Sequence, residues 1–275
     1  MKGQAMKTKH LKIAAFSALA ALVPISLAEI VTEEIRYLHD GVELKGLMVY
    51  DSEAEGRRPG VLVVHEWWGR GPYAQKRARM LAEQGFVAFA LDMYGAGVLV
   101  DSPAEARTLA TPFYADRPLM RDRAIAGLNV LLGSERVDPE RVAAIGYCFG
   151  GTVVLEMARA GAPLAAVVCY HGGLTGPHPM REGAFAGTVA VFNGAADPMV
   201  NHDDKKAFVE EMHKAKADFI FIDYAGALHS FTNPEADGLG MDGVGYDKKA
   251  DERSWRHTLD LFGEVFAAGN RDRND

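Results

Sequence analysis

The stretch that decides the fold is Gly146-Tyr147-Cys148-Phe149-Gly150-Gly151. The apolar run over residues 141–145 before it predicts a buried strand, and residues 152–159 after it predict a helix. Cys148 is therefore expected on the turn between strand and helix, with one glycine two residues before it and another two residues after it. That spacing is typical of a nucleophile elbow, here with sulfur in place of the usual hydroxyl. Glycine is needed at both places because side chains would collide across so sharp a turn.

A simpler alternative is that Cys148 only fills space. Free cysteine is often buried in glycine-rich turns, because it packs as a small hydrophobic residue. The elbow interpretation therefore requires a base, an acid and an oxyanion site elsewhere in the chain.

The rest of the chain alternates between strand and helix patterns. Two β-rich runs, at 30–38 and 42–50, flank the hairpin signal His39-Asp40-Gly41. Further strands are predicted at 61–65, 86–91, 164–170, 188–192 and 219–223, and helices at 72–84, 119–132, 205–216 and 248–266. This order predicts a single α/β domain over residues 29–275, with a mostly parallel sheet, helices on both faces and an N-terminal antiparallel hairpin.

One long irregular segment, residues 93–118, interrupts this alternation. It is rich in glycine and proline, and a short helix is predicted near residues 104–110. A segment of this length over a strand end usually shapes a pocket or acts as a lid.

Polar residues follow two of the predicted strands at the edge where function gathers in parallel sheets. Asp197 comes just after the strand at 188–192, and His229 lies in the loop after the strand at 219–223. The chain order Cys148, Asp197, His229 is that of nucleophile, acid and histidine in the α/β-hydrolase fold. The chemistry needs all three, because the imidazole takes the proton of the thiol and the carboxylate fixes the imidazole tautomer.

Each of these residues has a simpler interpretation when taken alone. Asp197 could begin a turn before Pro198, and His229 competes with eight other histidines, of which His65 and His171 also follow strands. The joint occurrence of a cysteine, an aspartate and a histidine at successive strand ends favours the catalytic hypothesis.

An oxyanion site of this fold uses two backbone N–H groups. The predicted donors are Phe149, directly after the nucleophile, and Trp67, in the loop after the strand at 61–65. Glu66 lies at the end of the same buried strand, where desolvation would raise the pKa of its carboxyl group. Pairing with an arginine such as Arg70 is the alternative for that carboxylate.

Five segments together resemble the dienelactone hydrolase family: Val63-Val64-His65-Glu66-Trp67-Trp68-Gly69, Ala90-Leu91-Asp92-Met93-Tyr94-Gly95, Gly146-Tyr147-Cys148-Phe149-Gly150-Gly151, Gly194-Ala195-Ala196-Asp197-Pro198 and His229-Ser230-Phe231. The resemblance covers essentially the whole chain after residue 28, and the cysteine elbow with the His-Glu strand end is its specific part. It implies an α/β-hydrolase fold and hydrolysis of an ester or lactone through a thioester acyl-enzyme, with Cys148, Asp197 and His229 as the triad. It also implies that Glu66 partners the thiol at rest and swings away when substrate binds.

One departure from the family concerns the substrate. The family binds a substrate carboxylate with arginines, one of them four residues after the catalytic histidine, where this chain has Asn233. The resemblance therefore implies the fold and the triad, and leaves a promiscuous esterase or thioesterase with another substrate as an alternative. Arg107, Arg117 or Arg121 of the lid segment could replace the missing arginine, although no spacing identifies one of them. The candidate substrate-binding residues are Tyr94, Arg117, Arg121 and Phe231.

The first 28 residues differ in kind from the rest. Lysines precede an apolar run over residues 13–23, and small residues stand at the −3 and −1 positions before a break after Ala28. This pattern predicts a secretory signal peptide and a periplasmic or secreted protein. An uncleaved or lipid-retained anchor is the alternative, although the run is too short to span a bilayer.

Composition and motifs weigh against other classes of protein. The formal net charge of −7 offers no basic surface for nucleic acid, and two cysteines make no disulfide framework. No metal-binding motif is present, and no cofactor is predicted. A nicotinamide-dependent oxidoreductase is suggested by the G-x-G-x-x-A pattern at 69–74, but Trp67-Trp68 places bulk where a dinucleotide needs a tight turn.

Two further classes of protein, a binding protein and a redox protein, could have the same fold without being hydrolases. A non-catalytic secreted binding protein would be expected to show a broken triad, and a redox protein would need a C-x-x-C motif. Neither feature is found in the sequence. The predicted partner is a small ester or lactone.

Overall fold

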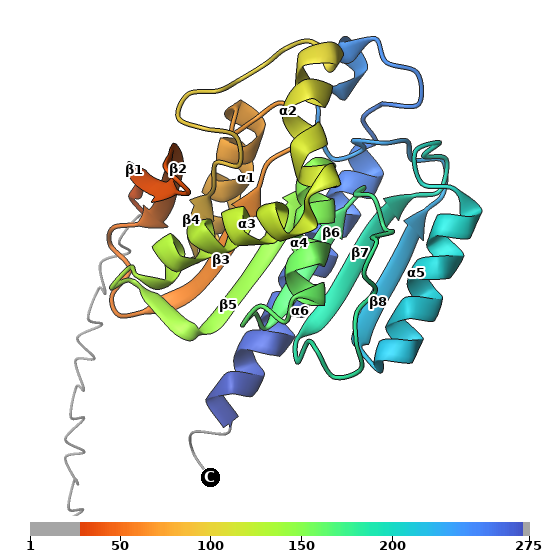
Figure 1. Cartoon of the computed structure of the whole chain (residues 1–275). Helices are drawn as coiled ribbons and strands as arrows, with labels where there is room; N and C mark the ends of the chain where they lie inside the picture. The colour runs from red at the N-terminus through yellow and green to blue at the C-terminus, as the bar shows by residue number, and fades with distance from the viewer. Residues whose placement is uncertain (1–27, 272–275) are drawn as a thin grey trace, which may run out of the picture.

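The computed structural model describes residues 28–271 (Figure 1). The signal peptide predicted over residues 1–28 lies outside the described residues, apart from its last one. Among the residues that are described, no helix is both long enough and apolar enough to cross a membrane.

The centre of the molecule is an eight-stranded sheet in the order β1-β2-β4-β3-β5-β6-β7-β8. The first two strands form the predicted hairpin, β2 pairs antiparallel with β4, and the pairs from β4 to β8 are parallel. The strands are β1 (Ile30–His39), β2 (Val42–Asp51), β3 (Arg58–Val64), β4 (Val87–Ala90), β5 (Val137–Tyr147), β6 (Ala166–Tyr170), β7 (Thr188–Gly194) and β8 (Asp218–Tyr224). The predicted α/β-hydrolase architecture is confirmed.

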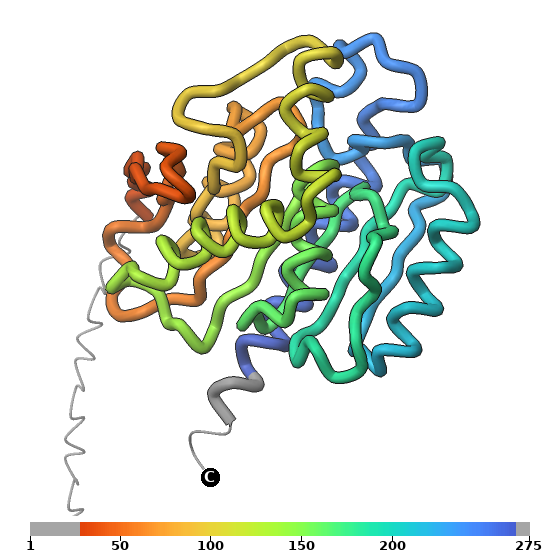
Figure 2. Tube along the Cα trace, in the orientation of Figure 1, coloured from red at the N-terminus to blue at the C-terminus, as the bar shows by residue number. Residues whose placement is uncertain are grey.

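Helices cover both faces of the sheet (Figures 1 and 2). The helices are α1 (Pro72–Ala82), α2 (Pro103–Ala115), α3 (Arg117–Leu132), α4 (Phe149–Arg159), α5 (His202–Ala215), the 3₁₀ helix η1 (Ala236–Leu239) and α6 (Lys248–Arg271). The apolar residues of α1 and α6 pack on one face, and those of α2, α3, α4 and α5 pack on the other.

This two-sided burial explains why the central strands are continuous apolar runs. In β3, Val61 and Val63 face the core under α1 and α6, whereas Leu62 and Val64 face the opposite core. All four are fully buried. A strand buried on both faces has no solvent side on which polar residues would alternate.

The strand register brings the functional loops to one edge. Val64 of β3 lies opposite Gly146 of β5, Tyr147 of β5 opposite Tyr170 of β6, and Tyr170 opposite Phe192 of β7. Loops that follow these strands therefore leave the sheet side by side at its carboxyl edge.

The lid segment contains more helix than the sequence indicates. The predicted short helix at 104–110 is α2, which runs to Ala115 and includes Pro112. Proline in a helix loses one hydrogen bond, which costs about 3 kcal/mol in an exposed helix. Here the buried face formed by Ala106, Ala110 and Phe113 packs on the core and offsets that loss.

Candidate active site

The backbone at Cys148 has the strained geometry of a nucleophile elbow. Cys148 has φ 53° and ψ −113°, and α4 begins at the next residue. A Cβ atom on Gly146 would lie 2.0 Å from the carbonyl oxygen of Gly150, and one on Gly150 would lie 2.3 Å from that of Val64. Both glycines are thus required by close backbone contact, as predicted. A left-handed non-glycine residue of this kind costs about 1–3 kcal/mol and is typical of functional sites.

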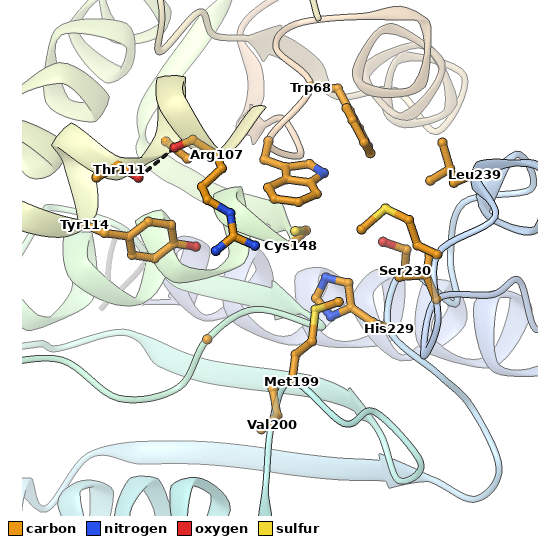
Figure 3. A pocket seen from close by; sticks show the side chains of 15 residues that line it. Trp68, Arg107, Thr111, Tyr114, Cys148, Met199, Val200, His229, Ser230 and Leu239 are labelled. Atoms are coloured by element: carbon orange, nitrogen blue, oxygen red, sulfur yellow. Dashed lines mark hydrogen bonds between the residues drawn. The ribbon is translucent and has the colours of Figure 1, made fainter. Parts of the chain in front are cut away.

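The predicted acid and histidine meet at this edge. Nδ1 of His229 lies 2.8 Å from Oδ2 of Asp197 in a buried ion pair, and Oδ1 of Asp197 accepts a hydrogen bond from the N–H of Met199. Among the described residues Nε2 of His229 has no hydrogen-bond partner. The ring and the Cys148 sulfur line the same cavity (Figure 3).

The electrostatics of His229 favour its charged form. Burial alone would lower the pKa of the ring, because a charged group loses its hydration there. The negative charge that Cys148 carries as a thiolate and the hydrogen bond that Nδ1 donates to Asp197 outweigh that penalty and raise the pKa of His229 to about 10. The charged imidazolium form of His229 is therefore favoured at neutral pH.

Two backbone N–H groups are free to bind an oxyanion. Neither the N–H of Trp67 nor that of Phe149 donates to an acceptor within the described part of the chain. Phe149 holds the first position of α4, where N–H groups point out of the helix and its dipole favours negative charge. Their role in the oxyanion site stays a prediction.

Glu66 is placed differently from what the family resemblance implies. Its carboxylate is buried and accepts hydrogen bonds from Oγ of Ser230, at 3.0 Å, and Nδ2 of Asn233, at 2.8 Å. Burial raises the pKa of Glu66, and these two hydrogen bonds oppose the rise. No hydrogen bond joins it to Cys148 among the described residues. The implied resting contact with the thiol is not seen here, and Ser230 and Asn233 hold the carboxylate instead.

A cavity of about 390 Å³ opens above Cys148. Helix α2 forms one rim and the segment around η1 forms the other, and the two lie side by side at the top of the molecule (Figures 1 and 2). The cavity is lined by Trp67, Trp68, Arg107, Ala110, Thr111, Tyr114, Cys148, Gly173, Met199, Val200, His229, Ser230, Leu239, Met241 and Val244.

One arginine of the lid reaches this cavity. The guanidinium of Arg107 extends from α2 toward its interior (Figure 3). Arg121 instead pairs with Glu156 at 2.6 Å, and Arg117 is buried against the ring of Tyr114. Neither of these two lines the cavity.

The two aromatic candidates also lie behind the cavity wall. The hydroxyl of Tyr94 donates to the carbonyl oxygen of Trp67 at 3.0 Å, and Phe231 is fully buried against His171. Both shape the site through the residues they support. The apolar rim was missed from the sequence: Met199 stands two residues after Asp197, and no pattern distinguishes it from an ordinary loop residue.

Other chemistries find little support in the site. Within residues 28–271, no group of three or more histidine, cysteine or acidic side chains is arranged to hold a metal ion. Gly69, from the dinucleotide-like pattern, has a different structural cause: at its φ of 95°, a Cβ would lie 2.6 Å from the carbonyl oxygen of Val98. That glycine is explained by the close approach of the lid segment.

Fold and site together define an α/β-hydrolase. The sequence pattern of the dienelactone hydrolase family matches residues 44–266, and the chain belongs to this family. It is a hydrolase of the class that acts on lactones and esters.

Three similar proteins illustrate the range of the family. A dienelactone hydrolase-like promiscuous phosphotriesterase from metagenomic libraries is 38% identical, with a TM-score of 0.82 over 86% of this chain and 98% of that one. A carboxymethylenebutenolidase from Pseudomonas is 28% identical over 186 residues, which are 65% of this chain and 76% of that protein. An uncharacterized protein of Caenorhabditis elegans is 39% identical over 150 residues, covering 54% of this chain and 95% of that one.

Proposed function

We propose that this protein hydrolyses carboxylic esters and lactones through a Cys148-His229-Asp197 triad and a thioester acyl-enzyme. One observation carries the proposal. The imidazole of His229 is fixed by Asp197 at Nδ1, while Nε2 stays unpartnered in the cavity that exposes the Cys148 sulfur. A base oriented by a carboxylate next to a nucleophile is the arrangement that acyl transfer requires.

Acylation begins from the thiolate–imidazolium pair. The sulfur attacks the carbonyl carbon, and the developing oxyanion accepts hydrogen bonds from the N–H groups of Trp67 and Phe149. When the C–O bond of the ester breaks, the leaving alkoxide takes the proton from Nε2 of His229. In a lactone the resulting hydroxyl group stays attached to the acyl chain on Cys148.

Deacylation reverses these roles. Neutral His229 takes a proton from water, and the hydroxide formed attacks the thioester carbon. The tetrahedral intermediate expels the thiolate of Cys148, releases the carboxylic acid and restores the imidazolium. Asp197 stabilises the ring in its charged form at both stages.

The cavity lining indicates an apolar substrate that carries a negative group. Aromatic rings and methionines form its walls, and Arg107 brings a positive charge into it (Figure 3). We expect Arg107→Gln to raise KM about tenfold for esters bearing a carboxylate, and to leave KM for neutral esters unchanged. Arg79→Gln is the control, since Arg79 is exposed on α1 and pairs with Glu83. Equal effects on both ester types would contradict the role of Arg107.

The test of the proposed function is hydrolysis of p-nitrophenyl acetate and of dienelactone by Cys148 variants. Cys148→Ala is expected to lower kcat at least about 1,000-fold, because no thioester can form. The matched control is Cys169→Ala, since Cys169 is the other cysteine and is buried in β6. Mass spectrometry should detect an acyl adduct on Cys148 only. Full activity of Cys148→Ala on both substrates would disprove the triad.

A second candidate activity is hydrolysis of phosphotriesters. The observation that favours it is the likeness to the promiscuous phosphotriesterase, at 38% identity over nearly all of that chain. A thiolate beside a free acid–base group could attack phosphorus as it attacks a carbonyl carbon. Paraoxon hydrolysis by the intact protein tests this, and a rate equal to that of the Cys148→Ala variant would exclude it.

A further inference from the structure

A second histidine lies directly beneath the nucleophile. His171 follows β6, is fully buried, and has the left-handed φ of 40°. Its Nδ1 lies 3.1 Å from the backbone nitrogen of Cys148, which also donates to the carbonyl oxygen of Tyr170 at 3.0 Å. The strained backbone of the nucleophile is therefore held by two acceptors on the neighbouring strand end.

The other ring nitrogen of His171 faces the loop that carries His229. Nε2 of His171 lies 2.8 Å from Oγ1 of Thr232, three residues beyond the catalytic histidine. The ring also packs edge-on against His229, with centroids 5.2 Å apart. His171 thus forms a bridge from the Cys148 N–H to the His229 loop.

The hydrogen-bond chemistry fixes the protonation state of this bridge. A backbone N–H can only donate, so Nδ1 of His171 must accept the hydrogen bond from Cys148. The ring proton is then on Nε2, which donates a hydrogen bond to Oγ1 of Thr232. Protonation of Nδ1 would set two N–H groups against each other. Burial, the neighbouring His229 and Arg77 all lower the pKa of His171, well below its usual range.

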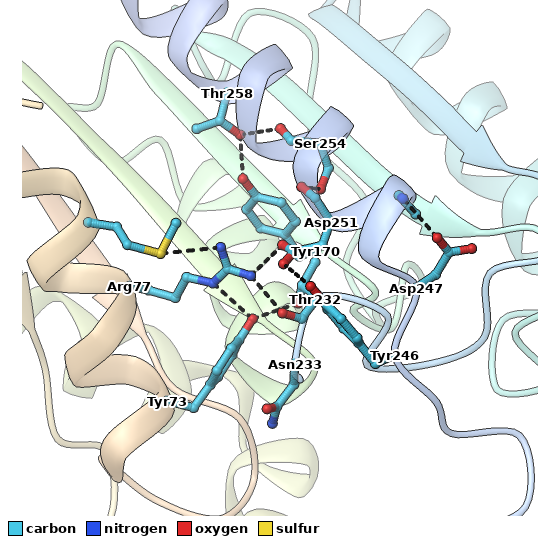
Figure 4. A network of polar contacts seen from close by, with 12 residues as sticks. Tyr73, Arg77, Tyr170, Thr232, Asn233, Tyr246, Asp247, Asp251, Ser254 and Thr258 are labelled. Carbon is cyan, nitrogen blue, oxygen red and sulfur yellow. Dashed lines mark hydrogen bonds and ion pairs between the residues drawn. The ribbon is translucent and has the colours of Figure 1, made fainter. Parts of the chain in front are cut away.

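The far end of the bridge is anchored in a polar network. The hydroxyl of Tyr73 donates to Oγ1 of Thr232 at 2.6 Å, and the guanidinium of Arg77 donates to the Thr232 carbonyl oxygen at 2.6 Å (Figure 4). Arg77 in turn pairs with Asp251 of α6. Thr232 is therefore held by two residues of α1, one of which is anchored to α6.

We propose that His171 is a positioning residue of the hydrolase, which sets the distance between Cys148 and His229 through its bridge to Thr232. The proposal rests on the proposed function, because the distance it sets matters only if these two residues react together. The titratable and charged groups that face His171 are Cys148 and Tyr147 from the elbow, His229 from its loop, and Arg77 of α1. Tyr73 is linked to His171 only through Thr232.

The first experiment removes the hydrogen bond between His171 and Thr232, which lies away from the triad. Thr232→Val removes the hydroxyl and keeps the shape, and Thr232→Ser keeps the hydroxyl as the matched rescue. We expect Thr232→Val to lower kcat for p-nitrophenyl acetate about 10- to 100-fold with KM changed less than about twofold. Alkylation of Cys148 by iodoacetamide at pH 7 should slow with it, since the imidazolium no longer stabilises the thiolate. Thr232→Ser should restore both values to within about threefold.

His171 is then tested directly. His171→Asn tolerates a positive φ and keeps an acceptor near the Cys148 N–H, whereas His171→Leu keeps bulk and removes both bonds. We expect the asparagine variant to be the more active of the two by about tenfold. If His171→Leu does not fold, the comparison of Thr232→Val with Thr232→Ser tests the proposal without it.

Two outcomes would overturn the proposal. One is a folded Thr232→Val protein with wild-type kcat and a wild-type pH profile of Cys148 alkylation. The other is a Thr232→Ser variant as impaired as Thr232→Val. Failure of the proposed function is seen separately, because the wild-type protein would then hydrolyse no ester while the alkylation profiles still report on the bridge.

Discussion

Two buried histidines with ring centroids 5.2 Å apart have opposite chemistry in this protein. Burial removes water from both rings and would keep each of them neutral. The pKa of His229 is nevertheless raised to about 10, whereas that of His171 is far below its ordinary value. Burial cannot explain this contrast, because both side chains experience it.

Neighbouring charges contribute to the difference, and so does the hydrogen-bond partner of one ring atom, Nδ1. Nδ1 of His229 donates a hydrogen bond to the carboxylate oxygen of Asp197. Nδ1 of His171 instead accepts a hydrogen bond from the backbone N–H of Cys148. The first ring is free to gain a proton at Nε2 and the second is not. The hydrogen-bond partner therefore assigns proton transfer to one ring and positioning to the other.

The largest effect is expected from a variant in which Nδ1 of His229 accepts a hydrogen bond, as Nδ1 of His171 does. In Asp197→Asn the side-chain amide can donate to Nδ1, which leaves the proton on Nε2, as in His171. We expect kcat/KM for p-nitrophenyl acetate to fall about 100- to 10,000-fold at pH 7. The loss of the carboxylate also lowers the pKa of His229 from its value of about 10, so alkylation of Cys148 should need a higher pH.

The control for this variant is Asp223→Asn, which alters another aspartate near a strand end. Asp223 lies in β8 and pairs with Lys205 at 2.9 Å. Its replacement should leave kcat/KM and the alkylation profile unchanged. If Asp197→Asn kept the wild-type alkylation profile, the carboxylate would not be what charges His229.

The local part of the site is readable from the sequence. The elbow around Cys148 depends on contacts among neighbours, because the glycines at 146 and 150 meet across a single turn. Asp197 follows a buried strand and His229 follows the edge strand β8, and both are recognisable as strands whose parallel ends share one edge. For these residues, chain order and strand topology suffice.

Contacts between distant segments are not readable in that way. Arginine is a residue type that binds substrate carboxylates, which makes Arg121 a candidate. Arg121 instead pairs with Glu156, which is 35 residues away, and no local pattern reveals the pair. His171 looks like any of nine histidines, because its tautomer depends on the backbone N–H of Cys148, 23 residues earlier. The course of α2 through Pro112 likewise depends on the core beneath it.

A Glu66 variant is expected to have a smaller effect, and it tests whether a nearby carboxylate without a hydrogen bond to the ring changes the charge of His229. Like Asp197 it is a buried carboxylate near His229, but Ser230 and Asn233 hold it rather than a ring nitrogen. The largest contributions that raise the pKa of His229 come from Cys148 and Asp197. Glu66→Gln is therefore expected to change kcat/KM by less than about threefold and to leave the pH profile of Cys148 alkylation unchanged.

The same variant should change stability in a pH-dependent way. Burial raises the pKa of Glu66 above its ordinary value of 4.5, so the folded protein binds this proton more tightly than the unfolded chain does. The contribution of Glu66 to stability is therefore complete below pH 4.5 and is lost as the pH rises through the raised pKa. Glutamine never ionises, so at pH 7 the Tm of Glu66→Gln should exceed that of the wild type by about 2–4 °C.

Thermal unfolding between pH 4 and pH 8 would measure this difference, with Glu83→Gln on the exposed side of α1 as control. The gain in Tm should shrink as the pH falls and disappear where the wild-type carboxyl group is protonated in both states. A lower Tm at pH 7 together with a shifted alkylation profile would place the Glu66 charge in the Cys148–His229 pair. The contrast between the two histidines would then depend on the summed charge around them and not on the partner at Nδ1.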